Sequence, residues 1–104
     1  MLACTPRKGT VIVRAVRLSR SAQKDLRLAP PQVRSKLKVW IASVSRDGLD
    51  EVRKIPGFHD EPLKGNRKGQ RSIRLSRSYR AIYQVLSDGT LRFVRVEEVS
   101  KHGY

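Results

Sequence analysis

The sequence has few of the side chains that bind metals or form disulfides. Cys4 is the only cysteine among 104 residues, and there are two histidines, His59 and His102. A lone cysteine excludes an internal disulfide and a cysteine-based zinc cluster. Two histidines and one cysteine are a poor set of metal ligands, so we expect no metal site, and we also expect no cofactor. The scarcity of cysteine also favours a reducing compartment, and we expect a cytoplasmic protein.

Long apolar runs are missing as well. No stretch approaches the ~20 apolar residues that a membrane-spanning helix needs, and the N-terminus lacks the apolar segment of a signal peptide. We therefore expect no membrane partner. The hydrophobic fraction of 38% is enough for one small core. These totals predict a single domain over residues 10–104, preceded by a loose tail over residues 1–9.

Acidic residues are scarce, and positive charge dominates. Lys and Arg number 23 against 9 Asp and Glu, which gives a formal net charge of +14. A protein this basic favours a polyanionic partner such as a nucleic acid, or an acidic protein that neutralises the charge. The charge is most one-sided from Lys64 to Arg80, a stretch with seven Lys or Arg and no acid.

Local patterns predict a strand and a helix after the tail. Residues 10–18, TVIVRAVRL, are β-branched and apolar with interspersed Arg, which is typical of a strand. Ser19 and Ser21 are both candidates for the N-cap of a helix that runs to about Ala29.

A second helix is predicted over residues 31–47. Pro30 and Pro31 end the first helix and start the next, because proline is tolerated in a first helical turn. The apolar side chains then recur at helical spacing as one stripe, formed by Val33, Leu37, Trp40, Ile41 and Val44. Gly48 is a natural C-terminal stop, and residues 49–55 predict a short helical turn.

Proline and glycine recur over residues 56–70 and predict a loop. Residues 70–76, QRSIRLS, alternate between apolar and polar side chains as a strand does. Residues 79–86 and 91–99 predict two more strands, joined by a tight Asp-Gly turn. The order strand, helix, helix and three strands predicts an α+β domain. In it, two N-terminal helices pack on one face of a mostly antiparallel four-stranded sheet.

The C-terminal part also carries a family pattern. The stretch DEPLKGNRKGQRSIRLSRSYRAIY (residues 60–83), followed by the terminal KHGY, resembles the RelE/YoeB branch of the RelE/ParE superfamily of bacterial toxins. In YoeB-like toxins a Glu-Pro-Leu-Lys-Gly loop precedes two Arg-bearing strands, and the chain ends in His and Tyr. The resemblance covers about the last 45 residues. It implies a β-α-α-β-β-β fold and a ribosome-dependent endoribonuclease that cleaves mRNA and is silenced by an antitoxin.

The residue types needed to cleave RNA without a metal are present. When the 2′-OH of RNA attacks the adjacent phosphate, the reaction needs a base, cations for the growing negative charge and an acid for the leaving oxygen. Glu61 is the candidate base, and its ordinary pKa near ~4.3 makes it a weak one unless its surroundings raise that value. Arg74 and Arg80 are the candidates for stabilising the phosphate. His102 is the candidate acid.

Other basic and aromatic residues complete the predicted site. Tyr104 would orient the substrate by stacking on a base or by holding the phosphate. Gly103 separates it from His102, whereas the two are adjacent in YoeB-like toxins. The division of roles therefore stays open, and Lys101 is a further candidate for charge stabilisation. The substrate-binding candidates in the basic stretch, where each phosphate contact would add affinity, are Lys64, Arg67, Lys68, Arg71 and Arg77.

Several alternatives remain open. Glu61 has an ordinary alternative as a loop carboxylate paired with Lys64. Arg74 and Arg80 have an ordinary alternative as the solvated face of a sheet. We expect His59 to be a structural or peripheral residue. A ParE-like protein on the same scaffold would inhibit DNA gyrase without being an enzyme. A plain RNA-binding module would account for the charge of +14 but not for the Glu-Pro-Leu-Lys-Gly loop or the terminal His and Tyr.

Overall fold

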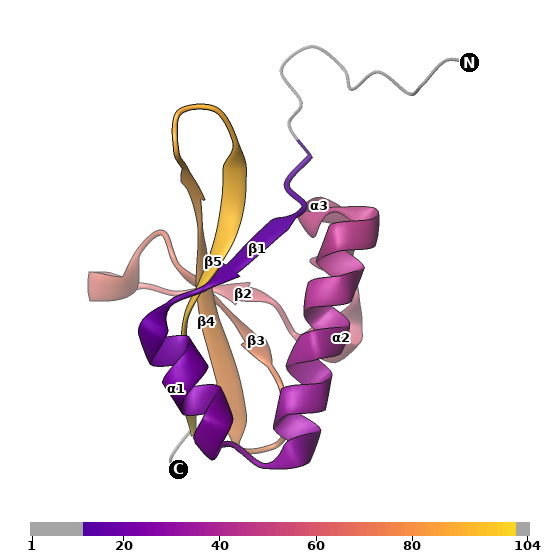
Figure 1. Cartoon of the computed structure of the whole chain (residues 1–104), viewed down its shortest axis with the longest axis vertical. Coiled ribbons are helices and arrows are strands. Elements are labelled where there is room, and N and C mark those ends of the chain that lie inside the picture. Colours follow the sequence, from indigo (N-terminus) through magenta and orange to yellow (C-terminus); the bar gives the residue numbers. More distant parts are fainter. Residues whose placement is uncertain (1–11, 102–104) are drawn as a thin grey trace.

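The computed structural model describes residues 12–101 (Figure 1). The loose tail predicted over residues 1–9 and the candidates His102 and Tyr104 lie outside the described residues. Within residues 12–101, no helix is long and apolar enough to cross a membrane. The elements in chain order are β1 (Ala15–Leu18), α1 (Arg20–Leu28), α2 (Pro31–Asp47), α3 (Leu49–Val52), the 3-10 turn η1 (Pro56–Phe58), β2 (Glu61–Pro62), the 3-10 turn η2 (Gly65–Arg67), β3 (Arg71–Arg74), β4 (Tyr79–Ser87) and β5 (Arg92–Lys101).

The α+β class is confirmed, but the counts of strands and helices differ from the prediction. The described residues form a sheet of five strands instead of four, and three α-helices instead of two. The additional strand, β2, has two residues, which is too short to show an alternating pattern in the sequence. The additional helix, α3, is a single turn in the segment where a helical turn was expected. The first strand begins at Ala15, and residues 12–14 precede it without strand structure.

The strands form one sheet in the order β1-β5-β4-β3-β2. β1 runs parallel to β5, from Ala15 opposite Phe93 to Leu18 opposite Val96. The other three pairs are antiparallel, as expected for a mostly antiparallel sheet. β5 is the last element of the described chain, but it lies inside the sheet between β1 and β4.

Capping and packing hold the two long helices in place. Ser19 is the N-cap of α1: its Oγ accepts a hydrogen bond from the Ala22 N–H at 3.0 Å and donates one to the Glu97 carbonyl at 2.7 Å. Gly48 ends α2 with a φ of 89°. The predicted apolar stripe of α2 is buried at Val33, Leu37, Trp40 and Val44, and Ile41 is partly buried.

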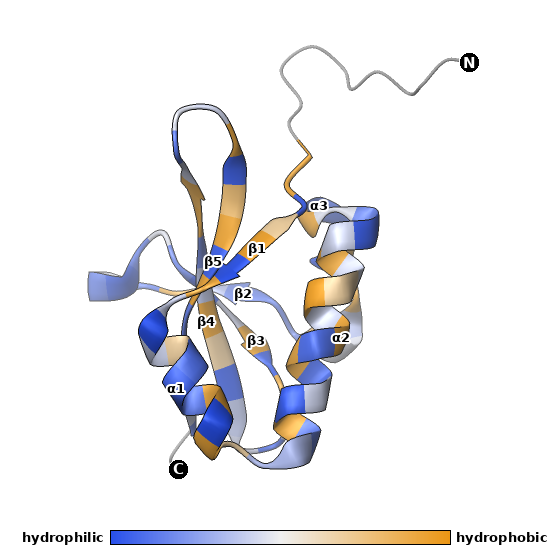
Figure 2. Cartoon of the chain, viewed as in Figure 1, coloured by the Kyte–Doolittle hydropathy of each residue, from blue (hydrophilic) through white to orange (hydrophobic). Residues whose placement is uncertain are grey.

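Both long helices pack on the same face of the sheet. Their buried side chains form one core cluster with side chains from β3, β4 and β5, namely Ile73, Ala81, Tyr83, Val94, Val96 and Val99. At the centre of this core, Trp40 of α2 contacts Tyr83 of β4, with ring centroids 5.1 Å apart. Figure 2 shows bands of hydrophobic and hydrophilic residues along β4 and β5, as expected for strands with one buried face.

Candidate active site on the open face of the sheet

The face of the sheet opposite the helices carries polar side chains from three neighbouring strands. Alternate residues of β3 and β4 are fully buried under the helices, so Ser72, Arg74 and Arg80 lie on the other face. Glu61 of β2 pairs with Ser72 of β3, and Arg74 pairs with Arg80 of β4. We call the face of the sheet that these four side chains share the open face, although Ser72 itself is only 1% exposed. Strand pairing thus brings three of the predicted site residues together, although they are up to 19 positions apart.

Glu61, Ser72 and Arg80 form a hydrogen-bonded group that we call the Glu61 cluster. Arg80 Nη1 donates to Glu61 Oε1 and to Ser72 Oγ, both at 2.8 Å. The Arg80 side chain is 19% exposed and the Glu61 side chain 44% exposed. The guanidinium is therefore mostly covered, whereas the carboxylate faces solvent. The cluster presents a carboxylate and a guanidinium from two different strands at one place.

The Arg80 guanidinium controls the protonation of this carboxylate. Its hydrogen bond to Glu61 lowers the pKa of that carboxyl, partial burial opposes the shift, and the charges of Arg80, His59 and Arg74 add to the lowering. Glu61 is therefore ionised at neutral pH and is a weaker base than a free glutamate while Arg80 holds it. An efficient base would need the opposite shift.

The remaining basic candidates of the loop and turns are exposed. Lys64 and Lys68 flank η2, and Arg77 lies in the turn between β3 and β4. Arg67 is 45% exposed and pairs with Glu98 of β5, with 2.9 Å between Nη2 and Oε1. Figure 2 shows the η2 segment as hydrophilic. The loop after β2 therefore adds positive charge beside the sheet and is tied to β5 through one ion pair.

Arg71 lies on the helix side of the sheet and not on the open face. Its Nε donates to Asp60 Oδ1 at 2.5 Å, and the Asp60 side chain is 0% exposed. The Tyr83 hydroxyl donates to Asp60 Oδ2. Burial and this hydrogen bond raise the pKa of Tyr83, so the phenol stays protonated. The sequence analysis missed Asp60, because its partners are 11 and 23 positions away and no local pattern marks it.

Lys101 is also directed away from the Glu61 cluster. It pairs with Tyr79 across β4 and β5, whereas Ser100 lies opposite Arg80. Because side chains alternate along a strand, Lys101 shares the face of Tyr79, which packs against the core. Lys101 is exposed at the end of β5.

His59 is a second residue that the sequence analysis did not place in the site. Its Nε2 lies 3.8 Å from Glu61 Oε2, and its side chain is 53% exposed. Its backbone is left-handed, with φ 50° and ψ 52°. No local signal in the sequence marked His59, because a left-handed residue does not follow the side-chain alternation of an extended segment.

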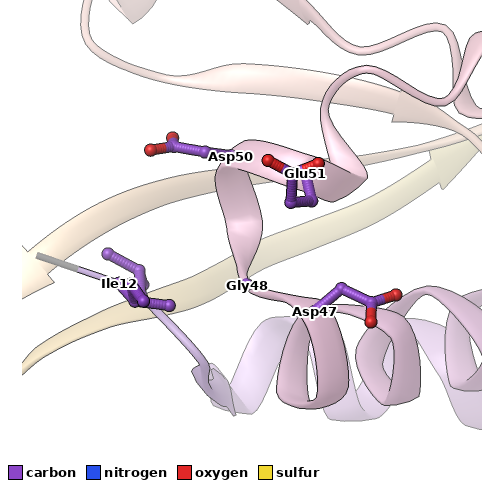
Figure 3. A pocket seen from close by; sticks show the side chains of 6 residues that line it. Ile12, Asp47, Gly48, Asp50 and Glu51 are labelled. Carbon is purple, nitrogen blue, oxygen red and sulfur yellow. The ribbon is translucent and has the colours of Figure 1, made fainter. Parts of the chain in front are cut away.

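A separate pocket of about 240 Å³ lies at the C-terminal end of α2 and shares no residue with the Glu61 cluster (Figure 3). It is lined by Ile12, Val13, Asp47, Gly48, Asp50 and Glu51. Each of its three acids pairs with a basic side chain one or three positions away in the chain. Among residues 12–101, no three His, Cys, Asp or Glu side chains gather as metal ligands would.

Known proteins share this fold. No protein-family model matches the chain, and no curated protein does so by sequence. Among solved structures, the Escherichia coli DinJ–YafQ toxin–antitoxin complex is similar, with 27% identity over 88% of this chain and 94% of that chain and a TM-score of 0.63. The RelBE2 toxin–antitoxin complex of Mycobacterium tuberculosis matches with 22% identity over 86% of this chain and 99% of that chain, and with a TM-score of 0.61. The YoeB/ParE toxin of Agrobacterium tumefaciens matches with 21% identity over 86% of this chain and 99% of that chain, and with a TM-score of 0.63.

These similarities confirm the resemblance to RelE/YoeB-like toxins of toxin–antitoxin systems that the sequence predicted. The five-stranded α+β architecture of the chain is the fold of these toxins.

Proposed function

We propose that this chain is the toxin of a toxin–antitoxin pair and acts as a ribosome-dependent endoribonuclease on mRNA. The observation that carries the proposal is the Glu61 cluster, in which a carboxylate and a guanidinium meet at 2.8 Å on the open face. The similarity to solved toxins supports the toxin class, and two of those toxins were solved with an antitoxin. A cytoplasmic protein with mRNA, the ribosome and an antitoxin as partners fits both observations.

The Glu61 cluster suits a phosphodiester because its guanidinium already binds an anion. In the proposed complex, Arg80 and Arg74 donate to the non-bridging oxygens of the scissile phosphate. Arg80 then turns from Glu61 to the phosphate, and the hydrogen bond that lowers the pKa of the carboxyl is lost. Glu61 therefore becomes a stronger base only when substrate is bound, and the ion pair with Arg80 is the resting state.

The reaction uses the 2′-OH of the RNA as nucleophile and needs no metal. Glu61 draws the proton from the 2′-OH, O2′ bonds to phosphorus, and the bond from phosphorus to O5′ breaks. Arg74 and Arg80 stabilise the negative charge that grows on the non-bridging oxygens. By the resemblance, His102 protonates the leaving O5′ and Tyr104 orients the substrate. The products are a 2′,3′-cyclic phosphate and a free 5′-OH, so DNA, which has no 2′-OH, is not a substrate.

The exposed basic side chains around the site supply affinity for the RNA backbone. Each phosphate that Lys64, Lys68 or Arg77 neutralises strengthens binding and makes it more dependent on salt. Arg67 contributes less while it is paired with Glu98. Arg71 and Lys101 both lie on the helix side of the sheet, so we assign them a smaller contribution to RNA binding than the sequence suggested. An acidic antitoxin would bind the same basic surface.

The test is translation in a purified system, with cuts in the mRNA mapped by primer extension. Glu61→Gln and Arg80→Ala should each lose about 100-fold or more of the cleavage rate, since each removes a group that acts in the transition state. Arg27→Ala removes the same charge from an exposed position of α1 and serves as the matched control. If Glu61→Gln and Arg80→Ala both cut like wild type, the site is wrong. If wild type does not cut, the function is wrong.

The second candidate function is inhibition of DNA gyrase, the alternative that the sequence left open for a ParE-like protein, and one solved structure of this fold is a YoeB/ParE toxin. An inhibitor that only binds has no use for a solvent-facing carboxylate held by a covered guanidinium. We expect no inhibition of DNA supercoiling by gyrase. Inhibition that persists in Glu61→Gln would favour the second candidate, and RNA binding without cleavage would favour a plain RNA-binding module.

A further inference from the structure

We propose that His59 is a catalytic residue of the same site and takes the proton of the RNA 2′-OH, with Glu61 holding the imidazolium that forms. This inference rests on the proposed function and revises one of its steps: the proton passes from the 2′-OH to His59, and not directly to Glu61. The carboxylate of Glu61 then acts through the imidazole, in the way an acidic side chain orients and stabilises a histidine base in other hydrolytic sites.

The two oxygens of the Glu61 carboxylate face different partners. Oε1 accepts the hydrogen bond from Arg80 at 2.8 Å, and Oε2 lies 3.8 Å from His59 Nε2. The charged group beside the imidazole is thus Glu61 of β2, whose carboxylate also feels the charges of Arg80 of β4 and Arg74 of β3. The imidazole is 53% exposed, so it is open to a substrate that binds the guanidinium groups.

The backbone of His59 supports a role for its side chain. Among residues 12–101, His59 is the only residue other than glycine with a positive φ. His59 is the C-cap of η1, where its N–H donates to the Pro56 carbonyl at 3.0 Å. Glycine or asparagine would adopt the left-handed backbone at this position with less strain. A histidine kept in a strained conformation beside a charged cluster points to use of the imidazole.

Asp60 anchors the segment between His59 and Glu61. Its buried carboxylate is held by Arg71 and Tyr83 on the helix side. His59 precedes it with a left-handed backbone, and Glu61 follows it as the first residue of β2. The side chains of His59 and Glu61 approach each other to 3.8 Å.

Proton transfer through His59 resolves the weakness of Glu61 as a base. Glu61 has a lowered pKa in the resting state, whereas imidazole is the side chain whose charge changes between about pH 5 and 8. In the proposed step the 2′-OH proton moves to the imidazole as O2′ bonds to phosphorus and the bond to O5′ breaks. The imidazolium pairs with the Glu61 carboxylate and returns its proton to solvent after the product leaves, so no further reactant is needed.

The experiment measures single-turnover cleavage on preformed ribosome–mRNA complexes between about pH 5.5 and 8, the range in which an imidazole titrates. The variants are His59→Asn and His59→Gly, which both tolerate the left-handed backbone. The wild-type rate should rise with pH as the imidazole loses its proton. In both variants the cleavage rate at pH 7.5 should be about 100-fold lower than in wild type, and the rate should no longer rise with pH. Added imidazole should restore part of the rate of His59→Gly but not of His59→Asn.

A His102→Asn variant separates the two histidines, since loss of the acid should lower the cleavage rate but leave its rise with pH in place. Unfolding midpoints of all variants identify any loss that arises from instability. Cleavage by both His59 variants at the wild-type rate overturns this inference and leaves the proposed function standing. A loss of rate with an unchanged pH profile and no rescue by imidazole overturns it as well. Absence of cleavage by wild type overturns both.

Discussion

Asp60 and Glu61 are consecutive in the chain, but their carboxylates lie on opposite faces of the sheet. Asp60 is fully covered on the helix side, where it accepts hydrogen bonds from Arg71 and Tyr83. Glu61 is 44% exposed on the open face, where it meets Arg80. Asp60 directly precedes β2, and Glu61 is the first residue of this strand. One acid anchors the segment, and the other remains available to a substrate.

Replacing Asp60 should destabilise the fold. Asp60→Ala leaves Arg71 and the Tyr83 hydroxyl without their shared acceptor, and removing one partner of a buried ion pair costs about 3–5 kcal/mol. Arg71 is 24% exposed and regains some hydration, so we expect about 2–3 kcal/mol. Urea unfolding followed by the fluorescence of Trp40, the single tryptophan, measures the change.

Tyr83→Phe is the control for this network, because it removes one hydrogen bond and keeps the ring against Trp40. We expect a loss of about 1 kcal/mol. If Asp60→Ala cost no more than Tyr83→Phe, the anchoring role of the buried carboxylate would be refuted.

Gly48 and Gly57 should respond differently to alanine. Gly48 has a φ of 89°, and a Cβ there would come within 2.9 Å of Ile12 Cγ2, so Gly48→Ala should cost about 1–2 kcal/mol. Gly57 has nothing within 4 Å of its Cβ position and no positive φ. Gly57→Ala should therefore be neutral or stabilise by about 0.4–1 kcal/mol. Thermal unfolding of the two variants checks the sign of each effect; equal losses would contradict the argument.

Ser19 and Ser21 allow a test of helix capping. Ser19 Oγ bonds the Ala22 N–H and the Glu97 carbonyl, so Ser19→Ala should lower the free energy of unfolding by about 1–2 kcal/mol. Ser21 is exposed within α1, and Ser21→Ala should stay within about 0.5 kcal/mol of wild type. Chemical denaturation of both variants gives the comparison. A larger loss for Ser21→Ala would mean that α1 starts two residues later.

The titration of Glu61 should depend on Arg80. In wild type the hydrogen bond from Arg80 holds the pKa of Glu61 below its ordinary value. In Arg80→Gln the midpoint of the Glu61 carboxyl resonance, followed by NMR, should move up toward that value. A lowered pKa in the folded state contributes stability that is present above the unfolded pKa and lost as pH falls through the folded one. Wild type should therefore lose more stability than Arg80→Gln on acidification below about pH 4.

An unchanged Glu61 midpoint in Arg80→Gln would show that the contact is not the cause of the shift. Arg27→Ala is again the control, because Arg27 is exposed on α1 and is not among the charges that act on Glu61.

Local signals were sufficient for much of the fold. The apolar stripe of α2 predicted which side chains reach the core, and the glycine after it predicted where the helix ends. The sequence offered two candidates for the N-cap of α1, Ser19 and Ser21, and the structure has Ser19 at this position. By contrast, two residues cannot show a period, so β2 was read as loop. The parallel pairing of β1 with β5 depends on contacts across most of the chain and has no local signature.

The site was less accessible from sequence, because strand register decides which face a side chain occupies. A shift of one residue in the strand register would move each side chain to the opposite face of the sheet. In the observed register Arg71 and Lys101 point away from the Glu61 cluster, whereas Arg74 and Arg80 do not. Glu61 and Arg80 were found through the family resemblance. His59 was left as peripheral because its left-handed turn, which returns it to Glu61, is a property of the fold and not of the residue type.

The position of β5 inside the sheet bears on how a newly made chain acquires its activity. Residues Ala15 to Leu18 pair with partners 78 positions further along, and β4 also needs β5 as its neighbour. Such long-range closure is slow, since the chain gains its stabilising contacts only after the whole loop has been ordered. We therefore expect a nascent copy to stay unfolded until β5 has been synthesised and released. The proposed toxin activity would then begin only after translation of the chain ends, and the proposed antitoxin would have that interval in which to accumulate.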